Sequence, residues 1–224
     1  MHDRSLAEGL ALIFDLDGVI VDSMPVHTAA WIQYLDGLGL PSAEIERTMH
    51  GRRNDEIVTA VIGATLSAEE VYAHGAAKEA LFREMIRAEL VNRLVPGVVE
   101  FLHAYRGAPL GLASNAEPAN IDFVLNAAGL RDAFQTVVDG MQVERPKPFP
   151  DVYTKAAGLL GVAPRNCIVF EDSPTGVAAA RAAGTRVVGV ETHAPLEDVD
   201  FRVRDFRGSE LIDWVGAQRP HPPQ

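Results

Sequence analysis

Short apolar segments that alternate with helical stretches constrain the fold of this chain more than any other feature. Five segments are rich in aliphatic and β-branched residues and are bounded by acids, glycine or proline: Leu10–Asp15, Pro109–Ser114, Gln135–Asp139, Cys167–Glu171 and Arg186–Val190. Runs of this kind are typical of buried strands. Helical patterns separate the later ones: Gly97–Tyr105, Pro118–Ala128, Asp151–Leu160 and Pro174–Ala183. This alternation predicts an α/β fold with a parallel sheet and helices on both faces.

One long interval interrupts the alternation. From Asp22 to Val95 the chain carries no strand pattern, whereas helical patterns cover His27–Leu38 and Ser67–Leu90. The second of these opens on Ser-Ala-Glu-Glu, which is the pattern of a capping box. A helical insertion directly after the first strand predicts a second, smaller unit over the edge of the sheet.

The interruption divides the chain. We expect a core domain from residues 1–21 and 96–217, an inserted helical cap domain from 22–95, and a disordered tail over 218–224, which contains three prolines. Prolines stiffen the expected hinges at Asp22–Pro25 and Val95–Gly97. Ligands bind off the carboxyl ends of the strands in open α/β sheets, so a cap inserted there would act as a lid.

Composition limits the classes of protein to which the chain can belong. It has 224 residues, of which 47% are hydrophobic and 23% charged, enough to bury a sizeable core without disulfides. No apolar run approaches the roughly 20 residues that span a bilayer. The single cysteine, Cys167, excludes an internal disulfide and a multi-cysteine zinc site.

The net charge of the chain limits the kinds of partner that it can bind. The 20 lysines and arginines against 31 acids give a net charge of −11, which repels nucleic acid and anionic membranes. We therefore expect no nucleic-acid or membrane partner. The lone cysteine and the lack of a long apolar run make a cytoplasmic protein the simplest expectation, and a monomer is the default. If its substrate is an anion, the site must supply its own cations.

Polar side chains follow four of the expected strands. Asp15 and Asp17 end the first strand before a glycine, a pattern that alone also fits two acids in a solvated turn. Further groups end or follow the second, third and fourth strands: Ser114 with Asn115, Lys147, and Glu171 with Asp172. A parallel sheet gathers such residues in one crevice. A lysine among these carboxylates can lower the pKa of an aspartate and hold a phosphoryl oxygen.

Four segments at these positions resemble the motifs of the haloacid dehalogenase (HAD) superfamily. They are FDLDGVIVDS, LASN, RPKPFPD and FEDSPTGVAAARAAG, and the resemblance runs from about Leu10 to Val190. Within the superfamily the chain is similar to the β-phosphoglucomutase-like group. This resemblance implies a Rossmann-like core with a helical cap and a phosphorylated metabolite as substrate.

The resemblance also implies roles for the residues that match the motifs. Asp15 would be the nucleophile that forms an aspartyl-phosphate, and Asp17 the general acid and base. Ser114, Asn115 and Lys147 would bind the transferring phosphoryl group. Asp15, the backbone carbonyl of Asp17, Asp172 and Glu171 would hold Mg2+, which prefers oxygen ligands.

The cap carries three weaker signals. His27-Thr-Ala-Ala-Trp31 resembles a segment of the group that couples lid closure to placement of the acid/base, although the i, i+4 spacing of His27 and Trp31 fits plain packing equally. The basic turn around Gly51, Arg52 and Arg53 suits the far end of a substrate, or is a solvated loop. Lys78 aligns with a lysine that the group points into its site, or is an ordinary surface lysine.

Three other functions share part of this pattern. A dehalogenase would share the nucleophile but would need neither Asp17 nor a metal held by Asp172. A phospho-accepting switch would need no lid. A phosphosugar mutase needs a grip for a second phosphate, where its pattern has a lysine and an arginine, but this chain has Glu117 and Asn54. The sequence thus favours a Mg2+-dependent phosphatase of small sugar or polyol phosphates, with a mutase as the alternative and the substrate left open.

Overall fold

A six-stranded parallel sheet forms the centre of the computed structural model, which describes residues 6–49 and 52–222. The strand order is β3-β2-β1-β4-β5-β6. The strands are β1 (Ala11–Phe14), β2 (Leu110–Ala113), β3 (Thr136–Val138), β4 (Cys167–Glu171), β5 (Arg186–Val190) and β6 (Phe201–Val203). The first five confirm the predicted strands. β6 was missed because its three residues include an arginine and carry too little apolar pattern to stand out.

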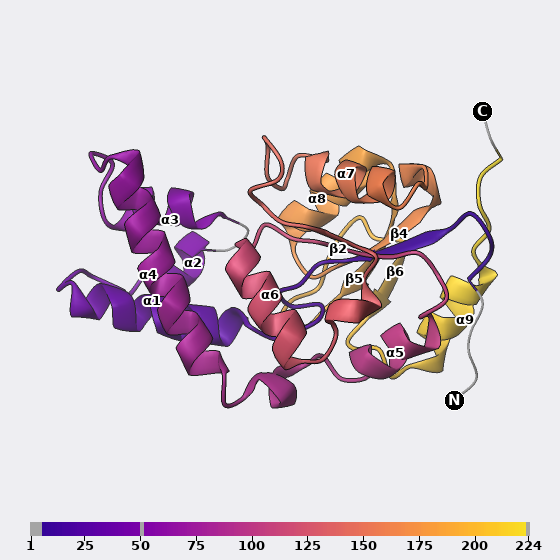
Figure 1. Cartoon of the computed structure of the whole chain (residues 1–224), viewed down its shortest axis with the longest axis horizontal. Helices are drawn as coiled ribbons and strands as arrows, with labels where there is room; N and C mark the ends of the chain where they lie inside the picture. Colours follow the sequence, from indigo (N-terminus) through magenta and orange to yellow (C-terminus); the bar gives the residue numbers. More distant parts are fainter. Residues whose placement is uncertain (1–5, 50–51, 223–224) are drawn as a thin grey trace.

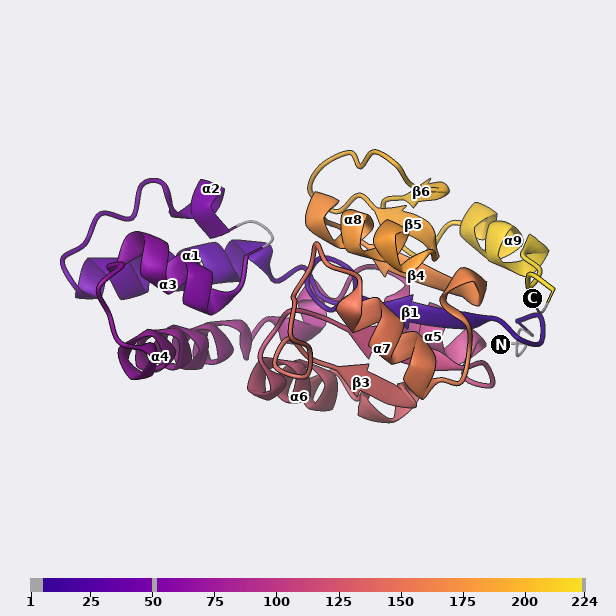
Figure 2. The same ribbon diagram turned by 90° about the horizontal axis from the view of Figure 1, so that it is seen from above.

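Helices cover both faces of the sheet (Figures 1 and 2). One face carries α5 (Val98–Ala104), α6 (Pro118–Ala127) and α9 (Ser209–Ala217), and the other carries α7 (Asp151–Leu159) and α8 (Pro174–Ala183). Within β1, Leu12 and Phe14 join the first apolar layer, whereas Ala11 and Ile13 join the second. Burial on both faces is the reason these strands read as continuous apolar runs.

Four helices lie together beyond the carboxyl ends of the strands (Figure 2): α1 (Met24–Gly37), α2 (Ile45–Met49), α3 (Asn54–Val61) and α4 (Ala68–Ile86). They share an apolar cluster of their own, which includes Trp31, Met49 and Val58. Ser67 and Glu70 form the predicted capping box at the start of α4. α2 and α3 were not predicted; each buries only two residues, Ile45 with Met49 and Ile57 with Val58, too few to mark a helical pattern. We propose residues 22–95 as the bounds of this cap and 1–21 with 96–217 as those of the core.

The end of the chain returns to the core. Residues 218–222, where we expected a frayed tail, form neither helix nor strand but make hydrogen bonds. The backbone N–H of His221 donates to Oδ1 of Asn166 at 2.7 Å, and Nη2 of Arg186 donates to the carbonyl of Arg219 at 2.8 Å. No helix among the described residues is long and apolar enough to cross a membrane.

Candidate active site

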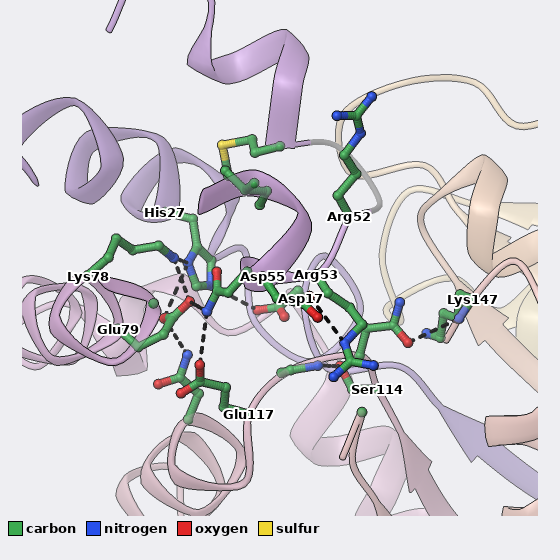
Figure 3. A pocket seen from close by; sticks show the side chains of 18 of the residues that line it. Asp17, His27, Arg52, Arg53, Asp55, Lys78, Glu79, Ser114, Glu117 and Lys147 are labelled. Carbon is green, nitrogen blue, oxygen red and sulfur yellow. Dashed lines mark hydrogen bonds and ion pairs between the residues drawn. The ribbon is translucent and has the colours of Figure 1, made fainter. Parts of the chain in front are cut away.

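A pocket of about 980 Å³ lies between the carboxyl ends of the strands and the cap helices (Figure 3). It brings together nearly all the predicted site residues that the structure describes. Its lining includes, from the core, Asp15, Asp17, Ser114, Asn115, Lys147 and Asp172, and from the cap, His27, Trp31, Arg52, Arg53 and Lys78. Gly51 lies outside the described residues. Glu171 is fully buried beneath the pocket rather than on its wall.

Lys147 is fixed between two buried carboxylates. Its Nζ lies 2.8 Å from Oδ1 of Asp15 and 2.6 Å from Oε1 of Glu171. The hydroxyl of Tyr153 also donates to Oε1 of Glu171 at 2.6 Å, while Oε2 accepts from the backbone N–H groups of Asp172 and Ser173. Glu171 therefore anchors the lysine that faces Asp15. Its role as a direct metal ligand stays a prediction.

These groups leave an excess of negative charge at the end of β1. Burial raises the pKa of Asp15 to about 7; Lys147 opposes the rise, and Glu171 and Asp17 add to it. Burial also raises the pKa of Asp172 well above its usual value, and Glu171 and Asp15 act in the same direction. Burial would lower the pKa of Lys147, but the attraction of Asp15 and Glu171 outweighs it and raises that pKa. One lysine does not neutralise three carboxylates.

This acidic cluster has the composition of a divalent cation site. One oxygen each from Asp15, Glu171 and Asp172 lie within 4.8 Å of one another. Carboxylate oxygens are the ligands that Mg2+ prefers, and a cation here would balance the charge excess. Gly18 makes the close approach feasible, because its φ is +74° and a Cβ there would overlap the Asp172 carboxylate. The residues present therefore fit magnesium.

Asp17 is held differently from Asp15. The hydroxyl of Ser23 donates to Oδ1 of Asp17 at 2.5 Å, and Nε2 of His27 lies 3.6 Å from the same oxygen. Burial would raise the pKa of Asp17, but His27 and Ser23 outweigh it and hold that pKa below its usual value. His27 comes from α1 and stacks on Phe82 of α4, with ring centroids 3.7 Å apart. A cap side chain thus contacts the second aspartate directly.

Lys78 is not a surface lysine, since its side chain is 1% exposed. Its Nζ lies 2.6 Å from Oε1 of Glu79, 3.0 Å from Nδ1 of His27 and 5.1 Å from the centre of the Trp31 ring. Burial would raise the pKa of Glu79, but the charges of Lys78 and His27 lower it to about 2. Trp31 packs in the apolar cluster of the cap and also lines the pocket, so packing and site placement both apply to it.

The loop after β2 presents the two small polar residues predicted to bind phosphate. Ser114 is almost fully buried, and its Oγ accepts from the backbone N–H of Ala116 at 3.2 Å. Oδ1 of Asn115 accepts from the backbone N–H of Lys147 at 3.2 Å. Asn115 thus ties this loop to the segment that carries the lysine.

The two arginines of the basic turn point in different directions. In Figure 3, Arg53 extends toward the side of the pocket where Ser114 lies, whereas Arg52 extends away from it. Arg52 is exposed and Arg53 is half-buried, with its Nε 3.6 Å from Oδ1 of Asp55. Of the pair, Arg53 is the better placed to reach a substrate in the pocket.

Several residues of the site were missed from the sequence. Ser23 contacts Asp17, Glu79 contacts Lys78 and Asn120, and Tyr153 supports Glu171 from below. An acid beside a lysine on a helix, such as Glu79 beside Lys78, looks like a solvated pair. No spacing in the sequence marks the contact of Glu79 with Asn120, because it depends on how the cap helices meet the core.

Comparisons with known proteins agree with the motifs. The model of the haloacid dehalogenase-like hydrolases matches residues 10–184. Fructose-1-phosphate phosphatase YqaB of Escherichia coli (strain K12) is 34% identical over 182 residues, 80% of this chain and 95% of that protein. Hexitol phosphatase B of the same organism is 32% identical over 213 residues, 91% of this chain and 93% of that protein. The crystal structure of a β-phosphoglucomutase (pgmB) from Clostridium difficile superposes with a TM-score of 0.81 at 26% identity, covering 96% and 97% of the two chains.

The comparisons and the geometry point the same way. The matched range contains all four motif segments, and the structure gathers their polar side chains at the carboxyl ends of β1, β2 and β4 and in the loop after β3. The solved mutase shares this fold over nearly the full length of both chains. The chain therefore belongs to the haloacid dehalogenase-like hydrolase family.

Proposed function

We propose that the chain is a Mg2+-dependent phosphatase of small sugar or polyol phosphates that works through an aspartyl-phosphate on Asp15. The observation that carries the proposal is the buried Asp15, 2.8 Å from Lys147 at the floor of the pocket, with Asp17 beside it. The relatives named fructose-1-phosphate phosphatase and hexitol phosphatase support the substrate class.

In the first half-reaction, Oδ of Asp15 attacks phosphorus and the bond from phosphorus to the ester oxygen breaks. Asp17 donates a proton to that leaving oxygen. Lys147 and the hydroxyl of Ser114 bind non-bridging phosphoryl oxygens, and Asn115 keeps the lysine loop in place. An anionic phosphate beside Asp17 raises the pKa of that carboxyl, which favours the proton needed for the step.

In the second half-reaction, a water attacks phosphorus and Asp17 takes its proton. The bond from phosphorus to Asp15 breaks, which regenerates the carboxylate and releases inorganic phosphate. Asp15, Asp172 and the backbone carbonyl of Asp17 would hold Mg2+, with Glu171 adjacent. Bound magnesium supplies positive charge that lets a carboxylate approach a phosphate.

A mutase is the second candidate, and the extent of the likeness to the solved β-phosphoglucomutase favours it. The first half-reaction is the same in both cases, and only the acceptor of the phosphoryl group differs. A mutase must also hold a second phosphate, and an acid at Glu117 repels one. We therefore propose water as the acceptor.

Release of inorganic phosphate from a panel of sugar, polyol and carboxylate phosphates, with Mg2+ and with EDTA, tests the proposal. We expect strong release from one or a few small sugar or polyol phosphates, and its loss in EDTA. If release is weak but β-glucose 1-phosphate converts to the 6-phosphate when a bisphosphate primer is added, the chain is a mutase instead.

A further inference from the structure

The pocket has two chemically different ends. In Figure 3, Ser114 and Lys147 lie at one end, while Lys78, Glu79 and Glu117 lie at the other. The first end carries the groups for the phosphoryl transfer. The second end, at the junction of α3 and α4 with the start of α6, would face the part of a substrate that does not react.

Four side chains form a wall at this second end. Nδ2 of Asn54 donates to Oε1 of Glu79 at 2.6 Å and to Oε1 of Glu117 at 3.1 Å. Nδ2 of Asn120 donates to Oε2 of Glu79 at 2.6 Å, and Nη1 of Arg83 donates to Oδ1 of Asn120 at 2.6 Å. We call Asn54, Glu79, Glu117 and Asn120 the distal wall; all four line the pocket.

The wall is built from both parts of the molecule. Asn54 opens α3 and Glu79 lies on α4, whereas Glu117 directly precedes α6 and Asn120 lies in its first turn. Gly75 on α4 adjoins the contact: a Cβ there would lie at ordinary van der Waals distance, 3.5 Å from Cβ of Asn54 and 3.9 Å from Oε1 of Glu117. The wall is therefore complete only when the cap lies against the core.

The two carboxylates of the wall differ in their charge balance. Glu79 has a cation, Lys78, at 2.6 Å. Glu117 has no ion-pair partner within residues 6–49 and 52–222, and its contact is the neutral amide of Asn54. Its Oε1 accepts that hydrogen bond, and its Oε2 accepts none from the residues described. Glu117 thus brings an unbalanced negative charge and a free acceptor oxygen to the pocket.

We propose, resting on the phosphatase function above, that the distal wall selects monophosphates whose non-reacting end bears hydroxyl groups and no negative charge. A hydroxyl can donate to the free oxygen of Glu117, whereas a second phosphate or a carboxylate meets a like charge there. Glu117 is then the residue that decides between a polyol monophosphate and a substrate with an acidic far end.

A pair of substrates that differ only at the far end tests this role. A hexitol 6-phosphate ends in a CH₂OH group, and the corresponding aldonate 6-phosphate ends in a carboxylate. We expect kcat/KM for the hexitol phosphate to exceed that for the aldonate phosphate by about 100-fold, since like charges at close range disfavour the wrong partner. Glu117→Gln, which keeps the size and the contact with Asn54, should reduce this ratio by about 10-fold or more.

A matched control variant shows whether the effect comes from the charge at Glu117 or from the net charge of the whole protein. Glu84→Gln removes the same charge from an exposed position on α4 that does not line the pocket, and it should leave the ratio as in the wild type. Glu117→Ala provides a second variant in case the first does not fold, as judged by circular dichroism and thermal unfolding. Both Glu117 variants should lower the ratio.

The outcomes distinguish the two proposals. If the wild type hydrolyses no monophosphate in the presence of Mg2+, the phosphatase function itself fails. If it hydrolyses both substrates equally well, or if both Glu117 variants keep the wild-type ratio, the role of the distal wall is wrong while the phosphatase function stands. A change of equal size in the ratio for Glu84→Gln would also overturn the role of the distal wall.

Discussion

The floor of the pocket and the side that the cap supplies both bury charged residues, but they balance charge in opposite ways. On the floor, three carboxylates meet one lysine, and the pKa of Asp15 rises to about 7. In the cap, Glu79 lies beside Lys78 and His27, and its pKa falls to about 2. An excess of negative charge that a cation can balance marks the reacting end, whereas the cap cluster is already balanced by its own side chains.

Removal of the carboxylate of Asp15 should have the largest effect. Asp15→Asn deletes the nucleophile, and we expect phosphate release to fall by about 10⁴-fold or more. Because the substitution relieves repulsion from Glu171 and Asp172, the thermal unfolding temperature should not fall by more than a few °C. Phosphate release and thermal unfolding measure the two effects. A variant that retains substantial turnover would remove Asp15 from the nucleophilic role.

Asp17→Asn should come next. Proton transfer is an interaction of the transition state, so we expect kcat to fall by about 10²- to 10⁴-fold with little change in KM. Steady-state kinetics on the best substrate of the panel measures both constants. An unchanged kcat, or an effect confined to KM, would mean that Asp17 positions substrate rather than moves a proton.

The same contrast explains how much of the site the sequence could predict. Asp15, Ser114 and Asp172 follow strands whose apolar runs are plain in the sequence, and a parallel sheet brings such strand ends to one edge. Chain topology therefore predicts that these residues gather on the floor, whereas their chemical roles were predicted from the resemblance to the HAD motifs. In the fold, too, the elements with a plain apolar pattern were found, the three-residue β3 among them, whereas β6, α2 and α3 were missed.

The distal wall and the cap cluster could not be predicted in that way. Contacts such as Asn120 with Glu79, 41 residues apart, depend on the packing of α4 against α6, and no local spacing encodes it. Glu117 and Asn54 depart from the mutase pattern in the sequence. Their contact with each other became visible only in three dimensions.

Glu79→Gln tests whether the cap cluster is structural. The change leaves Lys78 buried without its carboxylate partner, so we expect the free energy of unfolding to fall by about 3 kcal/mol. Glu84→Gln, on the exposed face of the same helix, should change it by less than about 0.5 kcal/mol. Chemical denaturation measures the free energy of unfolding of both variants. Equally small changes in the two would show that the pair of Lys78 and Glu79 contributes little to stability.

Magnesium should balance the excess negative charge on the floor of the pocket, and the stabilisation that it gives should depend on pH. In the metal-free protein the pKa of Asp15 is about 7, above its ordinary value of 3.8, so the folded state keeps a proton that the unfolded chain loses. The stability from that proton is present below about pH 4 and is lost as pH rises through about 7.

Mg2+ must displace this proton at pH 5 but not at pH 8, so it should raise the unfolding temperature by a few °C more at pH 8. Thermal unfolding with MgCl2 and with NaCl of equal ionic strength measures the difference. Equal shifts at both pH values would contradict a metal bound by Asp15, and the Asp15→Asn variant should show a smaller pH dependence.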